Sequence, residues 1–359
     1  MSATLFDPIS YGAIAAPNRV VMAPLTRQRS SDAHVPSDIM VEYYRQRAGA
    51  GLIISEGTGV SRQGMGWPNA PGLWTADQRE AWKPILAAVH EAGGRIVCQL
   101  WHLGRLARPD VIGMQPLSSS ATRAPYHKPE QNPYGEAKAA TKDDIARAVD
   151  EFGEAARAAI EVGFDGVQLH GANGYLIDQF LRDGTNHRDD EYGGAPENRI
   201  RFMVEAVRRV IAEAGAERTG IRLSPNGETQ GTDDSDPVSV FVPAAKALAE
   251  LNIAFLELRE QGPDHSFGKT DVPKLSPEIR KVFPGPLILN QEYSLAQAKA
   301  ALESGVADAI SWGRLYIANP DLAERFAAGA DLNAPNPRTF YTPGPEGYID
   351  YPALERQRA

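Results

Sequence analysis

The sequence is poor in cysteine and has no long hydrophobic run. Cys98 is the only cysteine among 359 residues, which excludes an internal disulfide and any zinc or iron–sulfur site built from cysteines. It lies in the apolar run Arg95–Leu100, where a small buried side chain is expected. No stretch approaches the ~20 continuous apolar residues that span a bilayer, and the first residues do not resemble a secretory signal. These absences predict a cytoplasmic protein that is not inserted in a membrane.

Positive charge is in deficit. The chain has 37 lysines and arginines against 46 aspartates and glutamates, which gives a formal net charge of -9. This balance disfavours nucleic acids and acidic membranes as partners. His34, His90, His187 and His265 are scattered without metal-ligand spacing, so we predict no metal site. The sequence leaves open whether the protein is a monomer or a homodimer.

Eight short apolar segments recur along the chain. Most are continuously apolar, as expected for parallel strands buried on both faces. Helix-start signals occur between them, including the capping box at Thr141, Pro196 at the start of a further helix, and Ser294. This alternation predicts a (β/α)8 barrel; a doubly wound sheet is the alternative, but no strand is followed by its Gly-x-Gly-x-x-Gly turn. The predicted strands are Arg19–Ala23, Gly51–Ser55, Arg95–Leu100, Asp165–Leu169, Gly220–Leu223, Ala254–Leu258, Leu287–Leu289 and Ala307–Ser311.

Two segments fall outside this repeat. Residues 1–18 contain the turn signal Tyr11-Gly12 and predict a hairpin that closes the N-terminal end of the barrel. Residues 103–140 form a long, proline-rich insertion after the third strand, and such an insertion in a compact domain is usually a lid or binding loop. No linker or repeat divides the chain, so we expect residues 1–359 to form a single domain.

The run His170-Gly-Ala-Asn-Gly-Tyr175 follows the fourth predicted strand. In a (β/α)8 barrel the chemistry lies at the carboxyl ends of the strands. An imidazole and a carboxamide supply two neutral donors, and the phenol of Tyr175 is a weak acid. Such a set polarises a carbonyl or nitro oxygen while a proton is delivered nearby. The alternative is an ordinary strand-end histidine beside a half-buried tyrosine, and this run alone does not decide between them.

Polar residues gather at the other predicted strand ends. Arg222 lies among apolar residues in the fifth strand, where a buried cation requires a carboxylate or an anionic ligand. Gln99 can donate and accept hydrogen bonds at once, which suits an imide edge. The remaining strand-end residues that we single out are Pro24, Thr26, Gly57, Trp101, Asn290, Gln291, Trp312, Gly313 and Arg314.

The segment after the eighth strand, Ser311-Trp-Gly-Arg314, predicts a phosphate site. Loops after the last two strands of such barrels commonly bind phosphate. A glycine amide can approach an anion closely, and an arginine can clamp phosphate with two hydrogen bonds. A glycine turn beside a solvated arginine is the alternative.

The run from His170 to Phe180, followed by Asn186-His-Arg-Asp-Asp-Glu-Tyr-Gly-Gly and Glu197-Asn-Arg-Ile-Arg-Phe, resembles the signature of the Old Yellow Enzyme family. The resemblance extends nearly end to end, from Asn18 to Pro352. It implies an FMN-dependent ene-reductase on a (β/α)8 barrel. Asp189, Asp190, Glu191 and Arg199 match the signature too, but we interpret them as an ion-pair and helix-start network, and His102 as a structural histidine.

The resemblance also implies roles for the strand-end residues. Thr26 and the Gly57 amide would lie beside flavin O4 and N5, Gln99 at the pyrimidine edge, and Arg222 beside N1 and O2. His170 and Asn173 would bind the substrate oxygen. The residues implied to hold FMN are Pro24, Thr26, Gly57, Gln99, Arg222, Asn290, Gln291, Gly313 and Arg314, the last four near its phosphate. Tyr175 would be the proton donor, and Trp101, Tyr341 and Trp312 would line an aromatic pocket.

The implied reaction has two halves that share one site. NADPH or NADH reduces a tightly but non-covalently bound FMN, which then reduces an α,β-unsaturated carbonyl or nitro compound, with N-ethylmaleimide and nitrate esters as further substrates. Two other functions are weighed against it. A sugar-phosphate aldolase or isomerase would share the phosphate site but should offer a strand-end lysine or paired carboxylates; no predicted strand end carries a lysine, and Glu56 and Glu257 are far apart in strand order. A flavin storage or sensor protein would not require His170, Asn173 and Tyr175.

Overall fold

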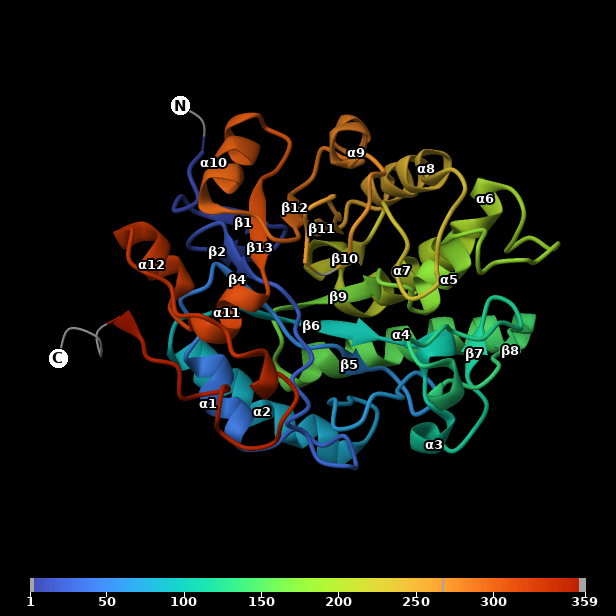
Figure 1. Ribbon diagram of the computed structural model, residues 1–359, viewed down its shortest axis with the longest axis horizontal. Coiled ribbons are helices and arrows are strands. Elements are labelled where there is room, and N and C mark those ends of the chain that lie inside the picture. Colours follow the sequence, from blue (N-terminus) through green and yellow to red (C-terminus); the bar gives the residue numbers. More distant parts are fainter. Residues whose placement is uncertain (1–2, 267, 355–359) are drawn as a thin grey trace.

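The computed structural model describes residues 3–266 and 268–354. Eight parallel strands form a closed barrel, in which β13 pairs with β3 and β4 pairs with β6, and helices surround it (Figure 1). The predicted (β/α)8 barrel is thereby confirmed. The barrel strands are β3 (Val20–Met22), β4 (Leu52–Ile54), β6 (Ile96–Trp101), β9 (Gly166–Gly171), β10 (Thr219–Leu223), β11 (Phe255–Arg259), β12 (Leu287–Asn290) and β13 (Ala309–Trp312).

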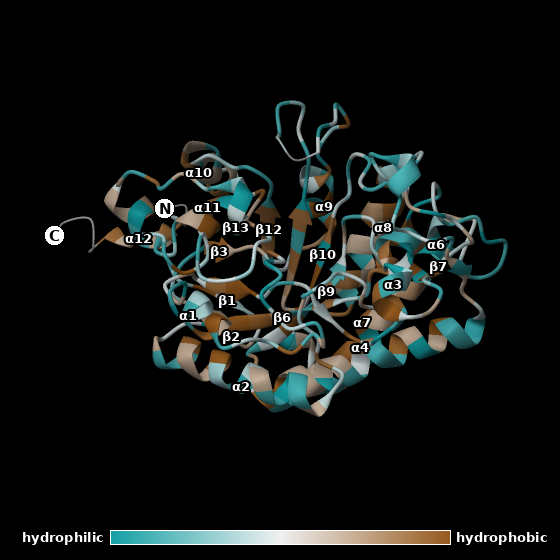
Figure 2. Cartoon of the chain, turned by 60° about the horizontal axis from the view of Figure 1, so that its bottom comes forward, coloured by the Kyte–Doolittle hydropathy of each residue, from teal (hydrophilic) through white to brown (hydrophobic). Residues whose placement is uncertain are grey.

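All eight predicted strands overlap observed ones, because short, continuously apolar runs bounded by turns are typical of parallel strands buried on both faces. Figure 2 shows the hydrophobic colour concentrated on these strands, with hydrophilic stretches along α2 and α4. The short strand β5 (Thr58–Gly59) pairs with the far end of β6 after β4 has ended, so Glu56 and Gly57 lie at a break in the second strand.

The helices follow the predicted start signals with one exception. Thr141 caps α4 through a complete capping box, and Ser294 does the same for α10. Pro196 opens only the short α6, and a separate helix, α7, begins at Arg201; the prediction of one continuous helix is wrong. The buried Arg199 lies at this break, where its guanidinium donates to the Leu181 carbonyl at 3.0 Å and pairs with Asp234, which anchors α6. The longer helices are α1 (Ile39–Arg45), α2 (Ala76–Glu91), α4 (Lys142–Val162), α7 (Arg201–Ala214), α8 (Pro237–Glu250), α9 (Ser276–Val282), α10 (Leu295–Glu303) and α12 (Leu322–Ala328), and the shorter ones are α3 (Pro109–Ile112), α5 (Leu176–Leu181), α6 (Pro196–Arg199) and α11 (Arg314–Ala318).

The predicted N-terminal hairpin is present as β1 (Ile9–Tyr11) and β2 (Ile14–Ala16). Its turn needs a glycine, because Gly12 has φ +58° and an added Cβ would lie 2.3 Å from the Glu217 carbonyl oxygen. The buried Tyr11 packs edge-on against Phe255 inside the barrel. The hairpin therefore closes the amino-terminal end of the barrel and leaves the opposite end for a site.

The lid insertion, residues 103–140, contains only elements of two to four residues, including β7 (Leu117–Ser118) and β8 (Lys138–Ala139). It is tied to α5 through Gln179, whose Oε1 accepts hydrogen bonds from Ser118 Oγ at 2.9 Å and from the Arg105 N–H at 3.1 Å. The Arg105 guanidinium donates to the Gly231 carbonyl at 2.7 Å. Within residues 3–266 and 268–354, none of the helices has the length and apolar character needed to cross a membrane.

Candidate functional site

A cavity of about 630 Å³ opens at the carboxyl ends of the barrel strands. This cavity is lined by all the residues that the sequence analysis assigned to catalysis, flavin binding and the aromatic pocket. They come from segments up to about 300 residues apart in the chain, and the barrel brings them together because parallel strands end on the same side. The predicted residues in its wall are Pro24, Thr26, Gly57, Gln99, Trp101, His170, Asn173, Tyr175, Arg222, Asn290, Gln291, Trp312, Gly313, Arg314 and Tyr341.

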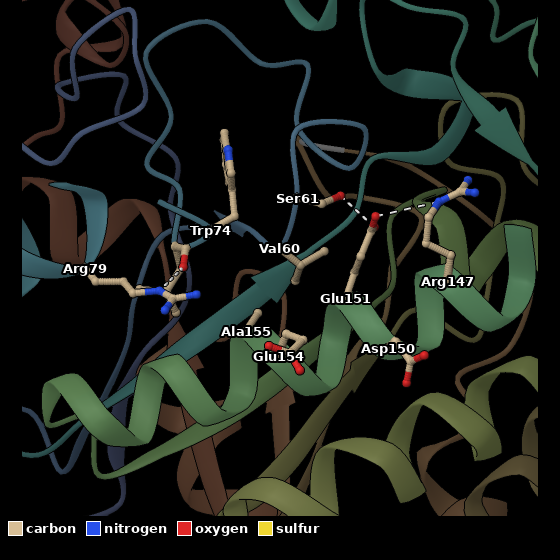
Figure 3. Close-up of a pocket in the computed structure, with 10 residues that line it drawn as sticks. Val60, Ser61, Trp74, Arg79, Arg147, Asp150, Glu151, Glu154 and Ala155 are labelled. Atoms are coloured by element: carbon tan, nitrogen blue, oxygen red, sulfur yellow. Dashed lines mark hydrogen bonds and ion pairs between the residues drawn. The ribbon is translucent and has the colours of Figure 1, made fainter. Parts of the chain in front are cut away.

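A second cavity, of about 520 Å³, lies outside the barrel between α4 and the loop after β5. Figure 3 shows Glu151 reaching from α4 to Ser61, whose hydroxyl donates to it at 2.6 Å, with Arg147 at 3.9 Å. Burial raises the pKa of Glu151. None of the predicted site residues lines this cavity, so the strand-end cavity is the candidate active site.

A chain of hydrogen bonds crosses the barrel below the candidate site. Gln99 Nε2 donates to Gln168 Oε1 at 2.8 Å, and Gln168 Nε2 donates to Glu257 Oε2 at 2.8 Å. Ser311 Oγ donates to the other oxygen of Glu257 at 2.6 Å. The side-chain amide of Gln99 is therefore fixed with its nitrogen toward Gln168, which defines the donor and acceptor that it presents to the cavity.

Arg222 is the central cation of the site. It stands on β10 between His170 of β9 and Glu257 of β11. One nitrogen, Nη2, donates to Asn290 Oδ1 at 2.7 Å, while Nε lies 3.8 Å from Glu257. Nε is buried and has no hydrogen-bond partner among the residues that the structure describes. A buried guanidinium with an unused donor favours an anionic ligand at this place.

His170, Asn173 and Tyr175 form one compact group at the end of β9 and the start of α5. The His170 and Tyr175 rings lie 4.7 Å apart at 72°, and Trp101 packs edge-on against Tyr175 at 5.0 Å. Gly174 permits this turn, because it has φ +78° and an added Cβ would lie 2.8 Å from the Thr229 carbonyl oxygen.

The protonation states of this group suit hydrogen-bond donation. Burial, with the charges of Arg222 and Arg259, holds the pKa of His170 well below its usual value, so the imidazole is neutral at pH 7. Burial raises the pKa of Tyr175, while a hydrogen bond from Gln230 opposes this shift. Tyr175 is therefore a neutral phenol at pH 7. Its burial favours the protonated form, which can donate a proton.

Glu56, a strand-end residue to which the sequence analysis assigned no role, precedes Gly57 and bonds the residue that follows Thr26. The buried carboxylate of Glu56 accepts hydrogen bonds from the Arg27 N–H at 3.3 Å and from the Tyr44 hydroxyl at 3.2 Å. Burial raises the pKa of Glu56 to about 7 against these contacts. Glu56 thus joins the loop after β3 to the break after β4.

The predicted phosphate end contains charged partners that the sequence did not reveal. Arg314 pairs with Glu292 at 3.1 Å and with the Ser266 hydroxyl, and Ser266 Oγ donates to Glu292 at 2.6 Å. Gln291 and Glu292 have φ +105° and +54°. Two successive non-glycine residues in the left-handed region cost ~1–3 kcal/mol each, and such strain tends to cluster at ligand sites.

The three predicted aromatic residues differ in their surroundings. Trp101 is buried beside Tyr175, whereas Tyr341 is 55% exposed at the rim. Trp312 lines the cavity, but its indole N–H donates to the Tyr293 carbonyl at 2.8 Å and its ring packs edge-on against Phe326. Trp312 is thus in part a packing residue. Further lining residues, to which the sequence analysis assigned no role, include Trp67, the strand-end residue Arg259, Ser266, Glu292, Tyr293 and Phe340.

The signature residues after α5 lie outside the cavity. Arg188 pairs with Asp190 at 2.5 Å, Lys142 pairs with Glu191 at 2.6 Å, and Arg199 is buried against Asp234. This segment therefore contains ion pairs and helix anchors, as interpreted from the sequence, although the Arg199 pair is buried and not on the surface.

Comparison with known proteins places the chain among flavin-dependent oxidoreductases. A family model described as the NADH:flavin oxidoreductase / NADH oxidase family matches residues 4–333. The protein named putative 12-oxophytodienoate reductase 4 of Oryza sativa subsp. japonica is 42% identical over 365 residues, which covers 98% of this chain and 94% of that protein.

Solved structures give the same result. The old yellow enzyme homologue NCR from Zymomonas mobilis has a TM-score of 0.96 at 59% identity and covers 98% of this chain and 100% of its own. Morphinone reductase has a TM-score of 0.94 at 41% identity, and the match covers 100% of this chain and 98% of that protein. A structure of morphinone reductase in complex with tetrahydroNAD is also similar to this chain. The predicted resemblance is confirmed. The chain belongs to the NADH:flavin oxidoreductase / NADH oxidase family, as an FMN-dependent oxidoreductase of the Old Yellow Enzyme type.

Proposed function

We propose that the protein is an NAD(P)H-dependent ene-reductase that saturates carbon–carbon double bonds conjugated to a carbonyl or nitro group. The observation that carries the proposal is the group formed by His170, Asn173 and Tyr175: two neutral donors and a protonated phenol, meeting in one cavity. Relatives named 12-oxophytodienoate reductase and morphinone reductase support a reductase of this kind.

The cavity residues fit an FMN group. The buried Nε of Arg222, which has no hydrogen-bond partner among residues 3–266 and 268–354, favours an anionic acceptor. The fixed amide of Gln99 offers both a donor and an acceptor to an imide edge. Bound FMN supplies a two-electron carrier that accepts and returns a hydride. We assign its tight, non-covalent binding to Pro24, Thr26, Gly57, Gln99, Arg222, Asn290, Gln291, Gly313 and Arg314, the last four for the phosphate.

The chain's own residues then promote alkene reduction by binding and proton transfer. His170 and Asn173 donate hydrogen bonds to the carbonyl or nitro oxygen of the substrate, where negative charge develops as the β-carbon receives a hydride. Tyr175 delivers a proton to the α-carbon, which completes the addition of two hydrogens across the double bond. Trp101 and the exposed Tyr341 border the space for the rest of the substrate.

The proposed substrates are enones, nitroalkenes, N-ethylmaleimide and nitrate esters, with NADPH or NADH binding in the same cavity as the reductant. A sugar-phosphate aldolase is disfavoured, because no lysine of the described residues lines the cavity. The lid and the hairpin pack onto the barrel, so we also propose that residues 1–359 act as one domain.

A visible spectrum and an anaerobic cycle test this proposal. The purified protein should be yellow, lose its colour with NADPH under anaerobic conditions, and regain it when 2-cyclohexen-1-one is added, with formation of cyclohexanone. A colourless protein that does not take up added FMN would contradict the cofactor assignment. A yellow protein that bleaches but is not reoxidised by enones would contradict the ene-reductase function.

A further inference from the structure

The side chain of Asn173 has two chemically opposite ends. Oδ1 accepts hydrogen bonds and Nδ2 donates them, and a half-turn of the amide exchanges the two at little steric cost. The backbone of Asn173 is already fixed: its N–H donates to Ser224 Oγ at 2.9 Å, and its carbonyl accepts from Gln230 Nε2 at 2.8 Å. A carbonyl or nitro oxygen only accepts, so Asn173 stabilises it only when Nδ2 faces the substrate.

Arg259, the last residue of β11, sets this orientation. Its Nη1 donates to Asn173 Oδ1 at 3.0 Å. An arginine has donors only, so a flipped amide would place Nδ2 against Nη1, two donors in contact. Within the part of the chain that the structure describes, Nδ2 makes no hydrogen bond, and both residues line the cavity.

Arg259 is itself held rigidly. It is 2% exposed, its Nε donates to Gln291 Oε1 at 3.2 Å, and its Nη1 also reaches Thr229 Oγ1 at 3.3 Å. Burial, together with the nearby charge of Arg222, lowers the pKa of Arg259 to about 10. The guanidinium therefore remains protonated at neutral pH and keeps its role as a donor.

We propose that Arg259 is a positioning residue that makes Asn173 a hydrogen-bond donor to the substrate oxygen, an inference that rests on the proposed function. A cation bonded to Oδ1 polarises the amide, so the Nδ2–H bond to the substrate strengthens as the oxygen gains negative charge. Because that charge is larger in the transition state than in the bound substrate, the effect falls mainly on the rate and not only on binding. The same arrangement selects substrates whose activating group accepts hydrogen bonds, such as ketones, aldehydes and nitro groups.

A double-mutant cycle tests the proposal in the holoenzyme. Reduced enzyme is mixed anaerobically with 2-cyclohexen-1-one, and the rate of flavin reoxidation is measured for Arg259→Leu, Arg259→Lys, Asn173→Ala and the Leu/Ala double variant. Loss of one donor at a developing oxyanion costs ~10²–10³-fold in rate, so Arg259→Leu, which releases the donor without removing it, should slow reoxidation about tenfold. Arg259→Lys should recover most of the rate, and Arg259→Leu should have little effect once Asn173 is alanine. Equal slowing in both backgrounds, or none in either, overturns the proposal.

A binding measurement gives a readout that needs no turnover. The Kd of cyclohexanone for the oxidised holoenzyme is measured from the perturbation of flavin absorbance, and it should weaken severalfold in Arg259→Leu. The control is Arg280→Leu, which removes a guanidinium that pairs with Asp308 outside the cavity; its Kd should equal that of the wild type. An unchanged Kd in Arg259→Leu contradicts the role of Arg259, whereas a wild type that binds cyclohexanone but reduces no enone contradicts only the proposed function.

Discussion

Arg222 on β10 stands opposite Glu257 on β11, with 3.8 Å between Nε and the nearer carboxylate oxygen. Both oxygens of Glu257 already accept short hydrogen bonds, from Gln168 and from Ser311. The Glu257 carboxylate thus balances the charge of Arg222 without accepting a hydrogen bond from the Arg222 Nε. Strand register holds this cation at the mouth of the barrel, where a ligand that becomes negative on reduction would be stabilised.

Replacing Arg222 should therefore change the redox potential of the bound flavin. A hydrogen bond to a charged group contributes ~1.5–3 kcal/mol, and ~1.4 kcal/mol corresponds to ~30 mV for a two-electron couple. We expect Arg222→Met to lower the midpoint potential by ~30–60 mV and to weaken FMN binding, as measured by dye equilibration and flavin release. Arg222→Lys, which keeps a charge, should show a smaller change. Equal potentials in wild type and Arg222→Met would contradict the assignment.

Tyr175→Phe should separate the two half-reactions. The variant keeps the ring that packs against Trp101 but loses the proton donor. We expect it to remain yellow and to be bleached by NADPH at a nearly normal rate, whereas reoxidation by an enone slows by ~10²–10⁴-fold, the usual contribution of one positioned acid. Stopped-flow measurement of each half-reaction checks this. Unchanged enone turnover would remove Tyr175 from the role of proton donor.

The barrel and most of the cavity could be predicted because their determinants are local. Each strand is a short apolar run, and the carboxyl ends of parallel strands meet whatever the loops do, so His170 and Arg222 had to converge once eight strands were recognised. The break between α6 and α7 was missed; the buried pair of Arg199 and Asp234 beside it forms only through tertiary packing.

The contacts that orient the site residues could not be predicted from the sequence, because they too form only through tertiary packing. Arg259 was visible as a strand-end residue, but its partner Asn173 lies 86 residues earlier in the chain, and nothing local indicates their pairing. Ser266 and Glu292 come from two different loops and meet at Arg314. Loop residues of this kind carry no periodicity, so they become apparent only when the fold is known.

His102 should make the free energy of unfolding depend on pH in the acid range. It is buried outside the cavity, its Nδ1 accepts from the Gly104 N–H at 3.1 Å, and its Nε2 has no partner among the described residues. Burial lowers the pKa of His102 to about 3, whereas an unfolded histidine titrates near ~6.5. Between these values the unfolded state binds more protons than the folded state, so stability is full above pH ~6.5 and falls as the pH is lowered.

We therefore expect His102 to contribute a loss of unfolding free energy of up to ~1.4 kcal/mol per pH unit below pH ~6.5. Urea unfolding of the wild type and His102→Asn at pH 7, 6 and 5 measures it. His102→Asn keeps an acceptor near Gly104 and should be less stable at pH 7 but less sensitive to acid. Parallel pH dependences in the two proteins would show that His102 does not titrate in this way.

Gln230 should set the acid strength of Tyr175. Its backbone is left-handed, with φ +55°, and its Nε2 donates to the Asn173 carbonyl at 2.8 Å. Burial raises the pKa of Tyr175, and the polar side chain of Gln230 opposes this shift. Gln230→Leu removes a donor that stabilises the tyrosinate, so proton delivery should become severalfold slower. Gln261→Leu is the matched control, because Gln261 donates to Thr229 in the same loop. If Gln230 acts through the Tyr175 phenol, Gln230→Leu slows flavin reoxidation by enones in the wild-type background and has no further effect in Tyr175→Phe. An equal loss of rate when Gln230→Leu is added to Tyr175→Phe, or an equal loss in Gln261→Leu, would mean that Gln230 only holds the loop in place.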